Sequence, residues 1–205
     1  HCGVVIADVS GKGVPAALFM MRVKALLNQL LREDLSPDQV LARANDGLCE
    51  DNEAGMFVTV WLGVLDLRSG KLVYANGGHN PPLYRHADGS VEWMRDRSGL
   101  LLGSFEGVPY RVFERTMIRG DSLILYTDGV TEAMDASDHC YGDERLFQLV
   151  ERECDGYPAS VSGVIEEDVR AFAEGADQAD DITLLVLRYD GQENGPAASA
   201  AENRV

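Results

Sequence analysis

Apolar positions follow a helical period at first, the period of two typical of strands from about residue 56, and the helical period again later. Residues 14–27 are apolar on nearly every side, which predicts a helix buried against a sheet, with Met20 and Met21 in the core. A second helix is predicted from Ser36 to Cys49, because a Ser-Pro-Asp-Gln start precedes an apolar stripe.

The middle of the chain predicts hairpins. Strand-like runs at 57–66 and 71–76 flank a short Gly-containing turn, and the runs 82–85 and 91–94 do the same. Further strands are expected at 4–8, 110–117, 122–127 and 182–189, and further helices at 142–151 and 158–173. Because strands joined by hairpins pair antiparallel, the sequence predicts an α/β protein with antiparallel sheets and covering helices, not a doubly wound nucleotide-binding fold.

Composition and charge narrow the class of protein. The 205 residues, 45% hydrophobic and 25% charged, are typical of one globular domain. The net charge of −16 argues against a nucleic-acid partner and against an anionic membrane surface. No stretch approaches the roughly 20 apolar residues of a membrane span, and no signal peptide is evident. We therefore expect a soluble, cytoplasmic domain.

The cysteines and the two ends of the chain add three expectations. The four cysteines show no zinc-site spacing, so we expect free thiols, although a disulfide stays open. Residues 190–205 are rich in Gly, Ala, Asn and Glu and are predicted to form a disordered tail. Residue 1 is His and lies close to a strand-like run, so we expect an N-terminal piece to be missing.

Acidic residues lie where apolar strand-like runs begin or end. Asp8 and Asp128 each follow such a run, and Asp180 with Asp181 precedes another. Carboxylates at strand ends sit on rigid elements yet face solvent, so several of them can converge on one hard cation such as Mg²⁺ or Mn²⁺. An isolated Asp at such a junction is usually a turn residue, but the three together predict a metal site. Such a site suits hydrolysis of a phosphate ester.

Two other residues have alternative interpretations. Lys12 follows a Gly-containing turn, but the segment does not meet the P-loop pattern, so we favour a solvated turn residue over a phosphate contact. His79 lies between Gly-Gly and Asn-Pro-Pro. It could act as a general acid or a ligand. We favour a role in shaping the loop.

Four segments resemble, in the right order, the signatures of the SpoIIE/RsbU-like branch of PPM-type serine/threonine phosphatases. They are Asp8-Val9-Ser10-Gly11-Lys12-Gly13-Val14-Pro15-Ala16-Ala17, Ala75-Asn76-Gly77-Gly78-His79-Asn80-Pro81-Pro82, Leu125-Tyr126-Thr127-Asp128-Gly129-Val130-Thr131-Glu132-Ala133 and Asp180-Asp181-Ile182-Thr183. The resemblance implies an α-β-β-α four-layer sandwich with two mainly antiparallel sheets over residues 1–189.

The resemblance also implies a site with two Mn²⁺ or Mg²⁺ ions. Asp8 would bridge the ions, the Val9 carbonyl would complete part of the shell, and Asp128 and Asp180 would bind one ion. These three aspartates are the expected catalytic residues. Asp181 is either a further acid at the site or a support for its geometry. The implied reaction is direct attack of metal-bound water on phosphoserine or phosphothreonine.

The resemblance implies bacterial signalling partners as well. The expected substrate is a phosphorylated STAS-type anti-anti-sigma protein, and the parent protein is expected to carry an N-terminal sensor module. A membrane link of the parent and a homodimer stay open.

Two departures from the family pattern leave alternatives. An upstream acidic motif of the family, whose Asp contributes to the metal pair, precedes the point where this chain begins, so we expect missing N-terminal strands and one weak metal site. Ser10 stands where eukaryotic relatives have a His, which leaves protonation of the leaving group unassigned. The alternatives are a non-catalytic phosphatase-fold module that binds a phosphoprotein, and a phosphatase of small phosphate esters.

Overall fold

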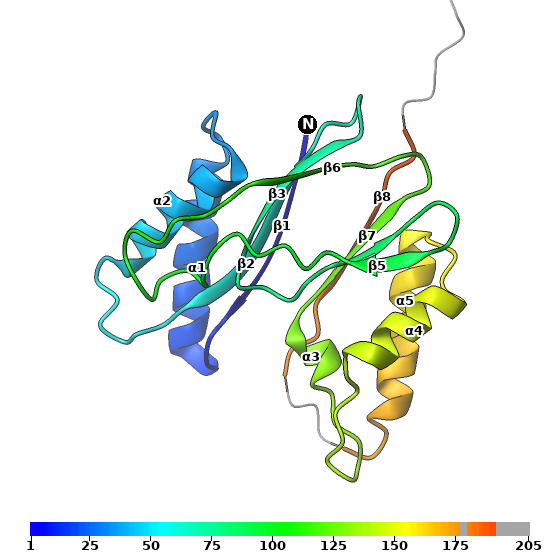
Figure 1. Cartoon of the computed structure of the whole chain (residues 1–205). Helices are drawn as coiled ribbons and strands as arrows, with labels where there is room; N and C mark the ends of the chain where they lie inside the picture. Colours follow the sequence, from blue (N-terminus) through cyan, green and yellow to red (C-terminus); the bar gives the residue numbers. More distant parts are fainter. Residues whose placement is uncertain (177–179, 192–205) are drawn as a thin grey trace, which may run out of the picture.

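Two antiparallel sheets lie face to face between helices in the computed structural model, which describes residues 1–176 and 180–191 (Figure 1). The first sheet has the strand order β1-β2-β3-β6 and the second β5-β4-β7-β8. The elements in chain order are β1 (Cys2–Val9), α1 (Gly13–Leu30), α2 (Pro37–Cys49), β2 (Val58–Leu65), β3 (Lys71–Gly77), β4 (Leu83–Arg85), β5 (Val91–Trp93), β6 (Phe113–Thr116), β7 (Ser122–Tyr126), α3 (Asp128–Thr131), α4 (Asp143–Glu153), α5 (Pro158–Phe172) and β8 (Leu184–Arg188).

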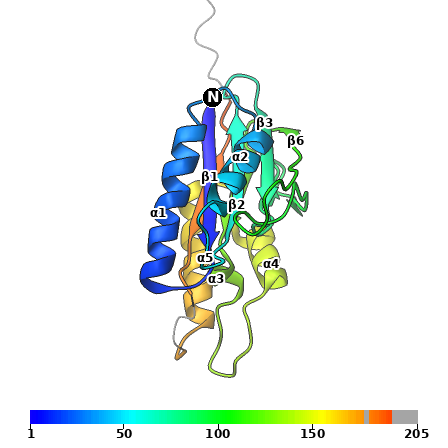
Figure 2. The ribbon, with the colours of Figure 1, turned by 90° about the vertical axis from the view of Figure 1, so that its left-hand side faces the viewer.

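The helices cover the outer faces of the two sheets. Helices α1 and α2 lie on the first sheet, and α4 and α5 lie on the second (Figure 1). Seen from the side, α1 and α2 lie in front of β1 and β2 (Figure 2). This arrangement is the four-layer sandwich implied by the family resemblance.

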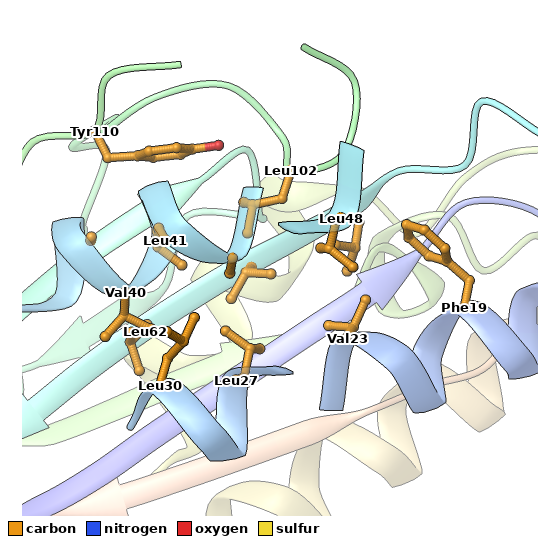
Figure 3. Packing of buried hydrophobic residues seen from close by; sticks show 14 residues of the cluster. Phe19, Val23, Leu27, Leu30, Val40, Leu41, Leu48, Leu62, Leu102 and Tyr110 are labelled. Carbon is orange, nitrogen blue, oxygen red and sulfur yellow. The ribbon is translucent and has the colours of Figure 1, made fainter. Parts of the chain in front are cut away.

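Three hydrophobic clusters fill the three interfaces between the layers. The first lies between α1, α2 and the first sheet, where Phe19, Val23 and Leu27 meet strand residues such as Leu62 (Figure 3). The second joins the two sheets, and the third lies between the second sheet and α4 and α5. The strands serve two clusters each because successive side chains point to opposite faces.

Most predicted elements are confirmed, including both hairpins. The start of α2 is also confirmed, because the Ser36 backbone amide donates a 3.1 Å hydrogen bond to Gln39 Oε1, as in a capping box. The strand expected at 110–117 is shorter, since only Phe113–Thr116 pairs with β3. Helix α3 was not predicted, because its four residues are too few to show a helical period.

Helix α1 packs against the first sheet, as predicted, but the prediction that it does not lie on a surface is wrong. Phe19, Val23 and Leu27 are buried, but Leu18 is 67% and Met21 65% exposed, which also contradicts a core position for Met21. The physical reason is that α1 belongs to an outer layer and packs on one side only. The apolar composition of residues 14–27 therefore could not show whether the helix is covered on one side or on all sides.

Strands β1 and β8 are the edge strands on one side of the two sheets. Together with α1 they line a largely apolar hollow of about 460 Å³, to which Val5, Met20 and Leu185 contribute. None of the helices in the described residues is long and apolar enough to cross a membrane. The predicted tail lies outside the described residues from position 192 onward.

Candidate metal centre

The predicted acidic residues come from both sheets and meet at one end of the sandwich. Asp8 is the penultimate residue of β1 and pairs with Thr59 of β2. Asp128 is the first residue of α3 and follows β7 after one intervening residue, Thr127, and Asp180 and Asp181 precede β8. Strands β7 and β8 are antiparallel neighbours, so the end of β7 lies beside the start of β8.

Asp8 and Asp128 are in contact, although they belong to different sheets. The pKa of Asp8 is raised from 3.8 to about 6 by burial first, and then by the charge of Asp128, a side-chain hydrogen bond to Asp128 and the charge of Asp180. The backbone amide of Val9 opposes this shift. A raised carboxyl pKa caused by neighbouring carboxylates marks uncompensated negative charge, which a cation can relieve.

Asp180 and Asp181 lie at the mouth of a hollow of about 660 Å³ that Asp8 and Val9 also line. The ammonium group of Lys12 lies 3.5 Å from Asp180 Oδ2, with both side chains about half exposed or more. The Asp181 amide donates a 2.8 Å hydrogen bond to Asp180 Oδ1. The Asp181 carbonyl accepts a 3.1 Å bond from the hydroxyl of Thr127. The backbone of Asp181 thus links the segment before β8 to the end of β7.

The turn after β1 is tied to the first sheet by Ser10. Its hydroxyl accepts the Phe57 amide at 3.0 Å, and its own amide donates to the Phe57 carbonyl at 2.9 Å. Gly11 and Gly13 both have positive φ, of 81° and 79°, which side chains rarely adopt. The turn therefore has a defined path between Val9, which lines the hollow, and α1.

His79 lies behind the carboxylates and joins them to β2. It is 5% exposed, and its Nδ1 lies 2.9 Å from Thr59 Oγ1, whose hydroxyl also lies 3.4 Å from the Asp8 carbonyl oxygen. The Asn76 side chain accepts the His79 amide at 2.8 Å and donates to its carbonyl at 3.0 Å. Burial lowers the pKa of His79 to about 4, against the opposing charge of Asp128, so the ring is neutral near pH 7. These contacts agree with the loop-shaping interpretation.

Sequence reasoning missed three supporting residues. Thr59 and Thr127 hold His79 and Asp181, and Asn76 fixes the His79 backbone. Asn76 belongs to the Asn-Gly-Gly-His segment, so that motif carried a signal for it. Thr127 belongs to the Leu125–Ala133 motif, which carried the same kind of signal. Thr59 lies outside the four motifs and resembles an ordinary strand residue, so only its tertiary contacts distinguish it.

The donors fit a hard cation in type, since they are carboxylate and carbonyl oxygens. Asp8 and Asp128 form a close pair, while Asp180 acts on Asp8 through its charge. Among residues 1–176 and 180–191, no three His, Cys, Asp or Glu side chains are gathered closely enough to hold one ion. The described residues thus provide a carboxylate pair with a third acid nearby, rather than a closed cage.

Comparison with known proteins decides the family. The model of the family described as Stage II sporulation protein E (SpoIIE) matches residues 1–190. The chain belongs to the SpoIIE family. SpoIIE-family membership accounts for the order of the four motifs and confirms the resemblance found in the sequence.

Two bacterial relatives and two solved structures resemble this SpoIIE-family chain. It is 29% identical to "Phosphoserine phosphatase RsbU" of Bacillus subtilis (strain 168), over 90% of this chain and 55% of that protein. It is 28% identical to "Phosphoserine phosphatase RsbP" of the same organism, over 90% of this chain and 45% of that protein. The chain thus spans about half the length of these relatives.

The structural neighbours share the fold. The SiaA-PP2C domain of Pseudomonas aeruginosa has a TM-score of 0.79 at 20% identity, over 92% of this chain and 76% of that one. The PP2C phosphatase domain of SpoIIE from Bacillus subtilis was solved with a fragment of its regulatory domain. It has a TM-score of 0.79 at 20% identity, over 93% of this chain and 54% of that one. The four-layer α/β architecture is therefore that of a PP2C-type, or PPM, phosphatase.

Proposed function

We propose that this chain is a metal-dependent protein phosphatase acting on phosphoserine or phosphothreonine. The observation that carries the proposal is the contact between Asp8 and Asp128, with Asp180 nearby, at the site where the SpoIIE-family motifs meet. The names of the relatives RsbU and RsbP support it, because both are described as phosphoserine phosphatases.

We propose Mn²⁺ or Mg²⁺ as the cofactor, held by Asp8, the Val9 carbonyl, Asp128 and Asp180, with Asp181 supporting the site. A structural neighbour at TM-score 0.62, the catalytic domain of PstP, was solved in complex with two manganese ions. When bound, such ions supply positive charge for phosphoryl oxygens and lower the pKa of water. The chain itself contributes the carboxylates and fixes their positions.

The surrounding residues position this charge. Neutral His79 and Thr59 support the end of β1, and Thr127 joins β7 to the segment before β8. Lys12 at the rim balances Asp180 in the structure and is close enough to the hollow to meet an anionic substrate. Lys12 is thus a solvated turn residue that is also placed to contact a phosphate.

The substrate and the rest of the parent protein are finer parts of the proposal. We propose a phosphorylated STAS-type anti-anti-sigma protein as substrate, and an upstream region with a sensor module and the additional acid of the metal pair. A solved structure that contains RsbU and RsbW domains of Rv1364c from Mycobacterium tuberculosis supports a link with partner-switching proteins. The chain is 25% identical to it, with a TM-score of 0.75, and covers 52% of it.

The proposal is tested by hydrolysis of a phosphoserine peptide and of p-nitrophenyl phosphate, with and without Mn²⁺. The assay compares this chain and an upstream-extended form with their Asp128→Asn variants. We expect Asp128→Asn to lower Mn²⁺-dependent turnover by about 100-fold or more. Asp34→Asn, which removes an exposed acid from the loop after α1, is the matched control and should keep full activity.

The same assay separates the alternatives. Absence of Mn²⁺-dependent turnover in both lengths, with retained binding of a phosphoprotein, would favour the non-catalytic module. Faster hydrolysis of small phosphate esters than of phosphoproteins would favour a metabolite phosphatase. Activity in the extended form alone would assign the deficit to the upstream acid.

A further inference from the structure

A second hollow, of about 510 Å³, adjoins the metal centre through His79. Its lining includes Arg95 and Arg97 from the segment after β5, and Trp93 and Leu100 on either side of them. His79 is shared between the two places, because it lines this hollow and also contacts Thr59 beside Asp8. The hollow therefore lies next to the carboxylate centre, with His79 between them.

The two arginines project from a segment that is anchored at both ends. Buried Met94 donates its amide to the Pro82 carbonyl at 2.9 Å. Buried Ser98 accepts the Asn76 amide on its hydroxyl at 2.7 Å and donates its own amide to the Asn76 carbonyl at 3.1 Å. Arg95 and Arg97, between these anchors, are exposed. Their backbone is thus fixed while their side chains face outward.

Neither guanidinium forms a hydrogen bond or an ion pair within the part of the chain that the structure describes, and Arg95 makes a contact 5.9 Å from the centre of the Trp93 ring. Two carboxylates also line the hollow, so its formal charges balance, and each of them accepts a tyrosine hydroxyl. Asp96 accepts from Tyr74 at 2.6 Å, and Asp143 accepts from Tyr126 at 3.3 Å. What sets Arg95 and Arg97 apart from other exposed arginines is that both line one hollow beside the carboxylate centre.

His79 also relates the hollow to the carboxylate centre. Its side chain is 5% exposed, and both the Tyr126 carbonyl and the charge of Asp128 act on its ring, against the effect of burial that lowers its pKa. The hollow that His79 lines therefore lies beside Asp128.

We propose that Arg95 and Arg97 form an anion-binding subsite for acidic side chains next to the phosphorylated residue of the substrate protein. This inference rests on the proposed phosphatase function and narrows its substrate class. Guanidinium groups bind carboxylates through paired, charge-assisted hydrogen bonds, whereas the phosphoryl group itself belongs at the carboxylate centre. The subsite selects phosphoproteins with Asp or Glu beside the phosphoserine or phosphothreonine.

The test compares three substrates: a phosphoserine peptide with acidic flanks, the same peptide with neutral flanks, and p-nitrophenyl phosphate. The variant is Arg95→Gln/Arg97→Gln, and the matched control is Arg119→Gln, an exposed arginine in the turn before β7, at the opposite end of that strand. We expect kcat/KM for the acidic peptide to fall about 10-fold or more in the double variant. The other two substrates should change less than about 2-fold, within the range of a weak surface charge effect.

Two outcomes would overturn the inference. An equal loss for all three substrates means that the arginines act on the phosphoryl group, and unchanged kinetics for the acidic peptide mean that they do not contact the substrate. A binding measurement keeps the test separate from catalysis. Fluorescence anisotropy of an unphosphorylated peptide with the same acidic flanks, in EDTA, should show weaker binding to the double variant than to the Arg119→Gln control. Equal binding there contradicts the subsite even if the chain has no phosphatase activity.

Discussion

At the residue scale, the site is defined by like charges that the fold forces together. Asp8 lies beside Asp128 and within the field of Asp180, and burial adds to the cost of its charge. Lys12 offsets part of this charge only at the solvent-exposed side of Asp180. We therefore expect the metal-free protein to be less stable than the same fold with one of these charges removed.

Asp8→Asn is expected to stabilise the metal-free protein and to weaken Mn²⁺ binding. Because the pKa of Asp8 is raised to about 6, its contribution to stability is present below about pH 4 and is lost as the pH rises through 6. With solvent screening, we expect a gain of about 1 kcal/mol at pH 8, or a Tm higher by about 2–4 °C, that shrinks below pH 6.

Calorimetry in EDTA and Mn²⁺ titration measure the two effects. Asp34→Asn is the control and should leave both the Tm and the Mn²⁺ affinity unchanged within error. A lower Tm for Asp8→Asn at pH 8, or an undiminished affinity for Mn²⁺, would show that Asp8 carries no unfavourable charge that a metal relieves.

At the element scale, the junction of β7 and α3 determines whether the acids from β7 and β8 meet. Gly129 follows Asp128, and a side-chain carbon at this position would lie 2.3 Å from the Asp181 carbonyl oxygen. The same carbonyl accepts the Thr127 hydroxyl. The close approach of the two backbones therefore requires glycine, although the φ of Gly129 is not positive.

Gly129→Ala is expected to destabilise the protein by about 2–4 kcal/mol, because the backbone must separate. Mn²⁺ affinity should fall as well, since Asp128 and Asp180 move apart. Gly163→Ala is the matched control, because Gly163 lies within α5 with no atom in the path of the added carbon. It should stabilise the protein by about 0.5–1 kcal/mol. Urea unfolding measures the stability of both variants. Equal stability of Gly129→Ala and Gly163→Ala would show that position 129 does not require glycine.

At the scale of the whole molecule, the inter-sheet cluster unites the two halves of the site. β1 belongs to the first sheet and β7 to the second, so Asp8 and Asp128 stay together only while the sheets remain stacked. Fully buried Leu123 and Trp61 lie in this cluster, one from each sheet. Stability and the geometry of the site are thus coupled through packing.

Leu123→Ala is expected to cost about 3 kcal/mol and to preserve a single unfolding transition. In a Trp93→Phe background, Trp61 fluorescence reports the interface between the sheets and circular dichroism reports all the helices, so the two signals should coincide. Leu67→Ala, at a position that is 47% exposed, should cost less than about 1 kcal/mol. Separate transitions for the two signals would show that the sheets unfold independently.

Local sequence patterns predicted most of the elements, and the motifs predicted the family. Period-two runs with turn residues between them specify hairpins, and the Ser36 capping signal specifies a helix start, because these depend on near neighbours in the chain. The four motifs carried the family and the fold class, because these residue types occur in a family-specific order. The metal-binding roles of Asp8, Asp128 and Asp180 stay predictions.

The tertiary structure alone decided which residues meet. The apolar composition of α1 could not show that Leu18 and Met21 face solvent, because burial depends on which layers cover a helix. The contact of Asp8 with Asp128 and the hollow beside Arg95 and Arg97 both join strands or loops of different sheets. Such contacts arise from the stacking of layers, and no local pattern of residues encodes them.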